Sequence, residues 1–330
     1  MTRAMRIGRD RLDPSRLPAL QAPDPDHRRR RVGAARLSSV RRLAEAGRGA
    51  SGRAHPRGEE AGAAVSDLWQ MLRGDSLLLL RDLPSDSVDA LITDPPYSSG
   101  GAFRGDRTPA ASTKYVASDS ISGQALPEVL GDSRDQRGLL VWSSIWLAEC
   151  YRVVRDGGYI AVFSDWRQLD TFGDAVQVGG FVKRGISPWI KPNARPQPGR
   201  PVQASEFVIW GSKGPMPFDR PCPITPGYWI ESPPPPKDRE HMTEKPLRIM
   251  RDLAKSCIPG GTILDPFAGA GTTGVGALLE GRKFLGIELS PEYHARACRR
   301  LRETETETLA GADRGSTAIG QGALFAAVGP

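Results

Sequence analysis

Asp265-Pro266-Phe267-Ala268-Gly269-Ala270-Gly271-Thr272-Thr273 is the stretch that decides the fold of this 330-residue chain. It follows a short apolar run at 262–264, predicted as a strand, and precedes a predicted helix at 273–279. A second apolar run at 284–287 comes next and ends at Glu288. Strand, glycine turn, helix and strand in this order form a βαβ unit, which joins two parallel strands of one sheet.

The glycine turn predicts a site for a nucleotide-type cofactor. Gly269 and Gly271 allow the backbone to approach a ligand closely, and the start of the following helix offers unpaired N–H groups. Glu288 can accept hydrogen bonds from ribose hydroxyls. The turn lacks the third glycine of a dinucleotide fingerprint and any Gly-Lys-Ser/Thr, which disfavours NAD and ATP. S-adenosylmethionine, an adenosine without a diphosphate, fits the pattern, and a plain tight turn is the alternative.

The second motif is Asp94-Pro95-Pro96-Tyr97, which ends another predicted buried strand at 87–93. Exocyclic base amines are poor nucleophiles because their lone pair is delocalised into the ring. The Asp94 carboxylate and the Pro95 carbonyl can each accept an amine N–H, which turns the lone pair toward a methyl donor. The Tyr97 ring can replace stacking that a base loses when it leaves the duplex. The predicted catalytic residues are therefore Asp94, Pro95, Pro96 and Tyr97.

Together these motifs resemble the β class of DNA amino-methyltransferases, the family of N6-adenine and N4-cytosine DNA methylases. The resemblance covers residues 73–302, and the order of the motifs marks the class, because the tetrapeptide precedes the glycine turn. It implies an α/β fold with a doubly wound, mostly parallel, seven-stranded Rossmann-like sheet and irregular target-recognition insertions. It also implies S-adenosylmethionine as the cofactor and double-stranded DNA as the substrate, with no metal site.

Two further segments match the same family. Gly74-Asp75-Ser76 resembles the segment that contacts the cofactor adenine, and residues 241–246 resemble an H-x-T-x-K-P segment beside the methionine end of the cofactor. The cofactor-binding residues that follow from the resemblance and the glycine turn are Asp75, Thr243, Lys245, Asp265, Phe267, Gly269, Gly271, Thr272, Thr273 and Glu288.

The identity of the methylated base depends mainly on Asp94. In this family an Asp at the first position of the tetrapeptide favours N6 of adenine, whereas Ser is more usual for N4 of cytosine. N6-adenine is therefore preferred, and N4-cytosine stays open as the alternative. Methylation of an RNA amine and an inactive nucleic-acid-binding subunit are further alternatives. A cytosine-C5 enzyme is disfavoured, because Cys222 lies within a Pro-Cys-Pro sequence in a variable segment rather than in a catalytic loop.

The predicted domain organisation has a disordered Arg-rich tail at 1–66, a methyltransferase domain at 67–305 and a flexible C-terminal tail at 306–330. Residues 1–66 contain 15 arginines, no lysine and seven acidic residues, so this tail alone holds a net charge of +8, against +7 for the whole chain. The tail is either a DNA-contacting arm or an upstream extension, with Met71 as the start. Two irregular segments, 98–138 and 192–240, are the expected DNA-contacting insertions.

Other elements are predicted from the spacing of apolar residues and from the glycine and proline residues that end helices and strands. Helices are expected at 139–154, 168–178, 246–257 and 291–301, and strands at 159–163, 185–190 and 206–210, the last two as a pair. Ser164 to Arg167 follow a strand end, where a helix cap is favoured over a catalytic role. Four widely spaced cysteines without a C-x-x-C pair, together with the absence of a membrane-length apolar run, predict a cytoplasmic protein. The sequence leaves open a homodimer and a separate restriction endonuclease.

Overall fold

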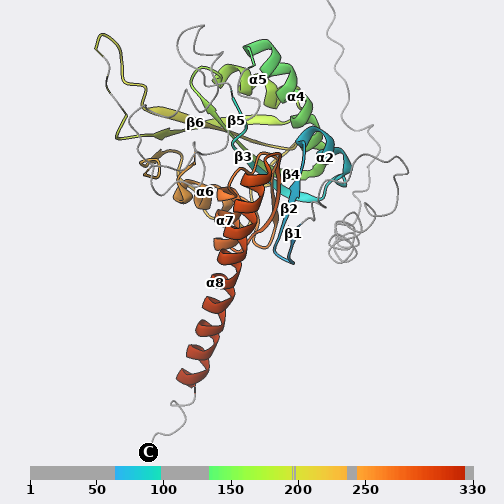
Figure 1. The fold of residues 1–330 in the computed structure, drawn as a ribbon, viewed down its shortest axis with the longest axis vertical. Coiled ribbons are helices and arrows are strands. Elements are labelled where there is room, and N and C mark those ends of the chain that lie inside the picture. The colour runs from blue at the N-terminus through green and yellow to red at the C-terminus, as the bar shows by residue number, and fades with distance from the viewer. Residues whose placement is uncertain (1–63, 98–133, 195, 197, 236–243, 324–330) are drawn as a thin grey trace, which may run out of the picture.

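The computed structural model describes residues 64–97, 134–194, 196, 198–235 and 244–323, with side-chain detail from 66 to 310 within those ranges. Its centre is one sheet with the strand order β1-β2-β9-β8-β3-β4-β6-β5-β7 (Figure 1). The strands are β1 (Ala64–Val65), β2 (Trp69–Arg73), β3 (Val88–Thr93), β4 (Val154–Asp165), β5 (Val182–Ile190), β6 (Ser205–Ser212), β7 (Trp229–Ile230), β8 (Thr262–Asp265) and β9 (Lys283–Glu288).

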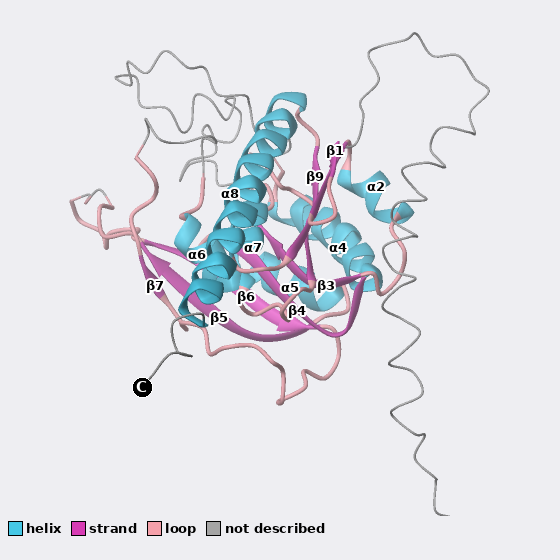
Figure 2. Ribbon diagram, turned by 90° about the horizontal axis from the view of Figure 1, so that it is seen from below, coloured by secondary structure: helices cyan, strands magenta, loops and turns pink. Residues whose placement is uncertain are grey.

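Helices cover both faces of the sheet (Figure 2). Apolar side chains from α2, α4 and α5 pack in one buried cluster with one face of the strands, and those from α6, α7 and α8 pack in a second cluster with the other face. The fold is thus a three-layer α/β/α arrangement. The helices are α2 (Ser76–Asp82), α4 (Gln136–Val153), α5 (Leu169–Val178), α6 (Leu247–Ala254), α7 (Thr272–Leu279) and α8 (Pro291–Ala323).

The predicted fold class is confirmed. The adjacent strands β2, β9, β8, β3 and β4 are all parallel, and β6 and β5 complete the sheet as an antiparallel pair. Their number, seven, is the number that the family resemblance implied, and the two-residue strands β1 and β7 extend the sheet at its edges. The expected pairing of 185–190 with 206–210 is seen in the β5–β6 hairpin.

The carboxyl ends of β8 and β3 lie next to each other at the point where the chain direction across the sheet reverses. From β8 the chain crosses through α7 to β9 on one side, whereas from β3 it crosses through α4 to β4 on the other. Such a switch point leaves a crevice at the strand ends, where ligands bind in open α/β sheets. The glycine turn follows β8 and the tetrapeptide follows β3, so the fold brings both predicted motifs to this position.

The structure corrects the expected gap between a helix at 139–154 and a strand at 159–163, which contains Asp156-Gly157-Gly158. Helix α4 ends at Val153 and strand β4 begins at once with Val154. The pairing of β3 with β4 jumps from Val88–Val154 to Ala90–Tyr159, so the extra β4 residues form a bulge. Gly157 has a φ of 72°, which explains a glycine in that bulge.

The structure also corrects the C-terminal boundary. The last helix was expected to end at 301 and to be followed by irregular chain from 306, but α8 continues to Ala323. In Figure 1 its second half extends away from the sheet. The hydroxyls of Thr304, Thr306 and Thr308 donate to carbonyls four residues earlier, so these polar residues are accommodated within a helix.

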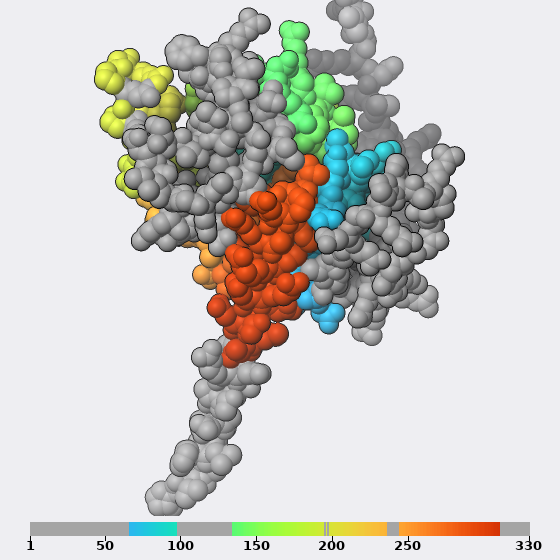
Figure 3. All heavy atoms as spheres, in the orientation of Figure 1, coloured from blue at the N-terminus to red at the C-terminus, as the bar shows by residue number. Residues whose placement is uncertain are grey.

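Strand β2 was not predicted, because its sequence, Trp69-Gln70-Met71-Leu72-Arg73, contains none of the β-branched residues that are enriched in strands. Trp69 pairs with Phe284 of β9, and Met71 is fully buried. Met71, considered above as a start, is therefore an internal residue of a core strand. Figure 3 shows α8 beside the N-terminal part of the described chain, where the Trp69 indole donates to Glu305 at 2.8 Å.

Several predictions fall outside the described residues, namely the segments 1–63, 98–133, 236–243 and 324–330. They include most of the Arg-rich tail, most of the first insertion, and Thr243. The predicted first insertion extends to 138, but its last three residues already belong to α4, which is capped by Asp135.

Across the described helices, none combines the length and the apolar character needed to cross a membrane.

Candidate active site

Asp94 follows the last residue of β3 and has an asymmetric environment. Its Oδ2 accepts a hydrogen bond from the Lys245 ammonium at 2.6 Å. Its Oδ1 is buried and has no hydrogen-bond partner among the described residues. Burial raises the pKa of Asp94 to about 6, although the Lys245 charge acts in the opposite direction. One carboxylate oxygen is therefore anchored, and the other is available as an acceptor.

Lys245 precedes α6 and is the centre of this part of the site. Its Nζ lies 3.3 Å from the Tyr97 hydroxyl and 3.4 Å from Oε2 of Glu206, and it also contacts the faces of Tyr97 and Phe163. Burial alone would lower the pKa of Lys245, but Asp94 and Glu206 outweigh it and raise the pKa. The lysine thus stays charged inside the protein because two carboxylates face it.

Asp265 connects the two motifs across the switch point. Its Oδ1 accepts hydrogen bonds from the Thr93 hydroxyl at 2.7 Å and from the Phe267 amide at 3.0 Å, and its Oδ2 accepts from the Thr273 hydroxyl at 2.6 Å. Burial raises its pKa to about 6. Because both oxygens are occupied within the protein, Asp265 and Thr273 fix the turn relative to β3.

The glycine turn has the backbone conformation that the sequence predicted. Gly269 and Gly271 have φ values of 52° and 81°, in the left-handed region that glycine adopts readily. A Cβ on Gly271 would lie 3.0 Å from the Cβ of Ala297 on α8. Gly271 is the N-cap of α7, and no described side chain caps that helix. The turn therefore presents backbone N–H groups at a helix N-terminus.

Glu288 lies at the end of β9, beside the turn. Its two oxygens accept hydrogen bonds from the Gly269 amide at 2.8 Å and the Ser290 amide at 2.7 Å. Burial raises its pKa despite these bonds. A carboxylate accepts more than two hydrogen bonds, so Glu288 can support the turn and still accept from a ligand hydroxyl.

The model of the N6/N4 methyltransferase family, described as DNA methylase, matches residues 88–299, more than half of the chain. The chain belongs to this DNA methylase family. The matched region begins with β3 and includes both the tetrapeptide and the glycine turn, so it contains the site built above. The family acts on the amines of DNA bases, N6 of adenine or N4 of cytosine, and uses S-adenosylmethionine.

Individual relatives agree with this assignment. The putative methylase YubD of Escherichia coli strain K12 is 28% identical over 233 residues, which cover 70% of this chain and 89% of that protein. The type II methyltransferase M.HinfI of Haemophilus influenzae is 28% identical over 266 residues, covering 71% and 68%. The crystal structure of the M1.HpyAVI–SAM complex matches with 25% identity and a TM-score of 0.51, covering 71% of this chain and 99% of that chain.

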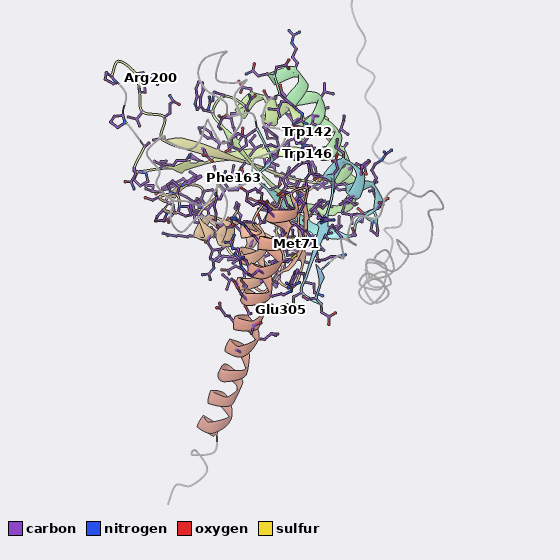
Figure 4. All side chains as sticks on the ribbon, in the orientation of Figure 1. Met71, Trp142, Trp146, Phe163, Arg200 and Glu305 are labelled. Carbon is purple, nitrogen blue, oxygen red and sulfur yellow. The ribbon has the colours of Figure 1, made fainter. Side chains whose placement is uncertain are left out.

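Phe267 of this methylase lies against two tryptophans of α4. Its ring centroid is 5.4 Å from that of Trp142 and 5.1 Å from that of Trp146, and Figure 4 shows both tryptophans on the same helix. The Arg134 guanidinium lies 4.3 Å from the Trp142 ring centroid. This aromatic wall next to the glycine turn was not anticipated from the sequence, because Trp142 and Trp146 are distant from it along the chain.

Asp75 has a structural role in this methylase. Its Oδ1 accepts from the Leu77 amide at 2.9 Å, so it is the N-cap of α2, and its side chain is exposed at the end of β2. The Ser76 hydroxyl donates to the carbonyl of Pro266, which ties this cap to the glycine turn. Contact of Asp75 with the cofactor adenine, implied by the resemblance, stays a prediction.

Thr272 belongs to a network that the sequence analysis missed. Its hydroxyl donates to Oε1 of Glu244 at 2.9 Å, and Arg300 of α8 donates to Glu244, to Thr272 and to the Ala270 carbonyl at 2.8, 3.1 and 2.9 Å. Arg300 thereby joins the glycine turn to the segment that contains Lys245. An arginine in an amphipathic helix gives no sequence signal for such a role, because most helical arginines are solvated.

The helix cap favoured above for Ser164 to Arg167 is wrong, because the N-cap residue of α5 is Gln168 and no described side chain caps this helix. The segment instead leads into the turn between β4 and α5. Oδ1 of Asp165 accepts from the amides of Arg167 and Gln168, both at 3.0 Å, directly before α5. Trp166 is 52% exposed rather than packed.

Of the predicted site residues, Asp94, Tyr97 and Lys245 are in direct contact, and Asp265, Phe267 and Thr273 form a second group around the turn.

Proposed function

We propose that this methylase transfers a methyl group from S-adenosylmethionine to the N6 amine of adenine in double-stranded DNA, with the target base flipped out of the helix. The observation that supports this proposal best is the buried Oδ1 of Asp94, which has no partner among the described residues. A buried carboxylate oxygen without a donor is unfavourable, and an amine N–H would satisfy it. The Pro95 carbonyl is the proposed second acceptor, and Tyr97 provides the aromatic face.

The residues around the glycine turn fit S-adenosylmethionine. Two glycines with positive φ keep the turn free of side chains, α7 offers unpaired N–H groups, and Glu288 can accept from ribose hydroxyls. The Phe267 and Trp142 rings form an apolar wall beside this turn. When bound, S-adenosylmethionine supplies an electrophilic methyl group on its sulfonium. The protein holds the acceptor amine and accepts its N–H hydrogen bonds, which is catalysis by positioning and electrostatics.

The β5–β6 hairpin is the proposed contact to DNA within the described residues. Arg200 lies near its tip, far from Trp142 and Phe163 at the centre of the fold (Figure 4). Residues 199–203 are exposed in this hairpin, which is part of the predicted 192–240 insertion. A protruding basic loop can reach the phosphate backbone or a groove while the target base occupies the site.

The identity of the product provides the direct test. Plasmid DNA and a matched RNA are incubated with the pure protein and S-adenosylmethionine, digested to nucleosides and analysed by mass spectrometry. N6-methyladenine in the DNA is the expected result. N4-methylcytosine would replace the adenine proposal with the cytosine one. Methylation of the RNA alone, or of neither nucleic acid, would overturn the proposed substrate.

The pH dependence provides a second test. The single-turnover rate at saturating DNA and S-adenosylmethionine is expected to rise through about pH 6, because Asp94 must be ionised to accept the amine hydrogen bond. Lys245, Glu206 and Asp265 are the charged groups that affect this titration. Cofactor affinity is measured separately at each pH, because the pKa of Asp265 is also about 6. A saturated rate that is flat from pH 5 to 8 would contradict the assigned role of Asp94.

A further inference from the structure

The site contains a row of four side chains with alternating charge, two of which lie outside the predicted motifs. Lys191 pairs with Oε1 of Glu206, Oε2 of Glu206 faces Lys245, and Lys245 pairs with Asp94. The Tyr97 hydroxyl also lies 3.3 Å from Oε2 of Glu206. The side chain of Lys245 is only 3% exposed and that of Glu206 15% exposed. Neither Glu206 nor Lys191 belongs to the tetrapeptide or to the glycine turn.

The sheet topology explains how Glu206 reaches this place. Strand β6 is antiparallel to β4, so its first residues lie at the edge where β4 ends, and Glu206 pairs with Asp165 in the register. Val208 and Ile209, which follow in β6, are fully buried. A carboxylate at the start of a buried strand is unfavourable unless cations face it. Burial would raise the pKa of Glu206, but Lys245 and Lys191 outweigh it and lower the pKa, so Glu206 is ionised.

We propose that Glu206 is a positioning residue that directs Lys245 to a single oxygen of Asp94 and thereby keeps the other oxygen available for the target amine. This inference rests on the proposed acceptor role of Asp94. It assigns Lys245 to the catalytic carboxylate rather than to the methionine end of the cofactor, which the family resemblance suggested.

Lys245 has as many N–H donors as it has oxygen atoms around its ammonium group. An ammonium group has three N–H donors, and Nζ of Lys245 has three oxygens around it: Oδ2 of Asp94, Oε2 of Glu206 and the hydroxyl of Tyr97. Without the negative charge of Glu206, Asp94 would be the only anionic partner of the ammonium among the described residues, and the ammonium could move between both carboxylate oxygens. Oδ1 of Asp94 would then be partly occupied when the amine arrives. The same Glu206 oxygen holds the Tyr97 hydroxyl, which fixes the orientation of the ring.

Glu206→Gln tests this inference, because it keeps the size of the side chain and removes its charge. The single-turnover rate is expected to fall roughly tenfold or more, in the range seen when supporting residues of a site are changed. The dissociation constant for S-adenosylmethionine should stay unchanged. The rise of the rate with pH, which is the acid limb of the pH–rate profile, should move to lower pH. The reason is that the negative charge of Glu206 contributes to the raised pKa of Asp94. Lys245 and Asp265, the other charged groups near Asp94, are kept.

Glu149→Gln is the matched control, because Glu149 is also ion-paired, with Arg152 at 2.9 Å, but lies outside this cluster. It should leave both the rate and the profile unchanged. If Glu206→Gln slows the reaction without moving the acid limb, Glu206 has a packing role only and the inference is wrong. Should that variant fail to fold, Lys191→Gln provides the test, because it removes the second cation that pairs with Glu206. A severalfold loss of rate at saturating DNA supports the inference, and an unchanged rate overturns it.

Failure of the inference can be distinguished from failure of the proposed function. Asp94→Asn reports on the function, because Asp94 is the proposed acceptor. An inactive Asp94→Asn together with a fully active Glu206→Gln would overturn only the role of Glu206. An active Asp94→Asn would overturn the acceptor role itself, and the positioning role of Glu206 with it.

Discussion

Asp94→Asn is expected to reduce the single-turnover rate of methyl transfer at least about a hundredfold, the scale measured when one preorganised hydrogen-bonding group is removed from a catalytic site. The amide retains the shape of the carboxylate, but its single oxygen must face the Lys245 ammonium, so its NH2 group takes the place of Oδ1 and cannot accept the amine N–H. It also removes the charge that faces the Lys245 ammonium at 2.6 Å. Transfer of a labelled methyl group to DNA in one turnover measures the effect.

Binding of S-adenosylmethionine should survive this substitution, because Asp94 follows β3 whereas the glycine turn follows β8. Calorimetry of the variant with the cofactor checks this and shows that the protein is folded. Asp156→Asn is the matched control, since the Asp156 side chain is 94% exposed, and it should be fully active. The opposite pattern, an active Asp94→Asn with an inactive Cys222→Ser, would indicate a covalent cysteine mechanism.

Most of the sheet could be predicted because buried parallel strands are continuous apolar runs with clear ends. Proline ends the strand before Asp94, and glycine marks the turn after Asp265, so both motifs could be placed on strand ends. Strand β2 and the start of β4 were harder. Strand β2 contains no β-branched residue, and the bulge in β4 disrupts the alternation on which strand prediction depends.

The candidate site was predictable where chemistry is local in sequence, and not where it is brought together by the fold. Asp94 and Tyr97 are neighbours in one tetrapeptide, whereas Glu206 reaches them only through the antiparallel pairing of β6 with β4. A weak signal for Glu206 exists, since it is a charged residue at the start of an otherwise apolar strand. Arg300 has no such signal, because its contacts to the glycine turn depend on how α8 packs.

Gly271→Ala is expected to weaken S-adenosylmethionine binding about tenfold or more, which corresponds to about 1.4 kcal/mol of binding free energy. Gly271 has a φ of 81°, where a residue with a Cβ costs about 1 to 2 kcal/mol. The new Cβ would also lie 3.0 Å from the Cβ and 3.2 Å from the Cα of Ala297. Backbone atoms cannot move aside as a flexible side chain can, so the turn must shift, and with it the N-terminus of α7.

Gly281→Ala separates these two effects. Gly281 has a φ of 67°, in the same left-handed region, but an added Cβ there would meet nothing within 4 Å. Both variants should therefore unfold at lower temperature than the wild type, and only Gly271→Ala should lose cofactor affinity in calorimetry. Equal affinities in the two variants would mean that the turn before α7 does not bind the cofactor. A loss confined to Gly271→Ala would place the cofactor at the turn that follows β8, because backbone strain alone is common to both.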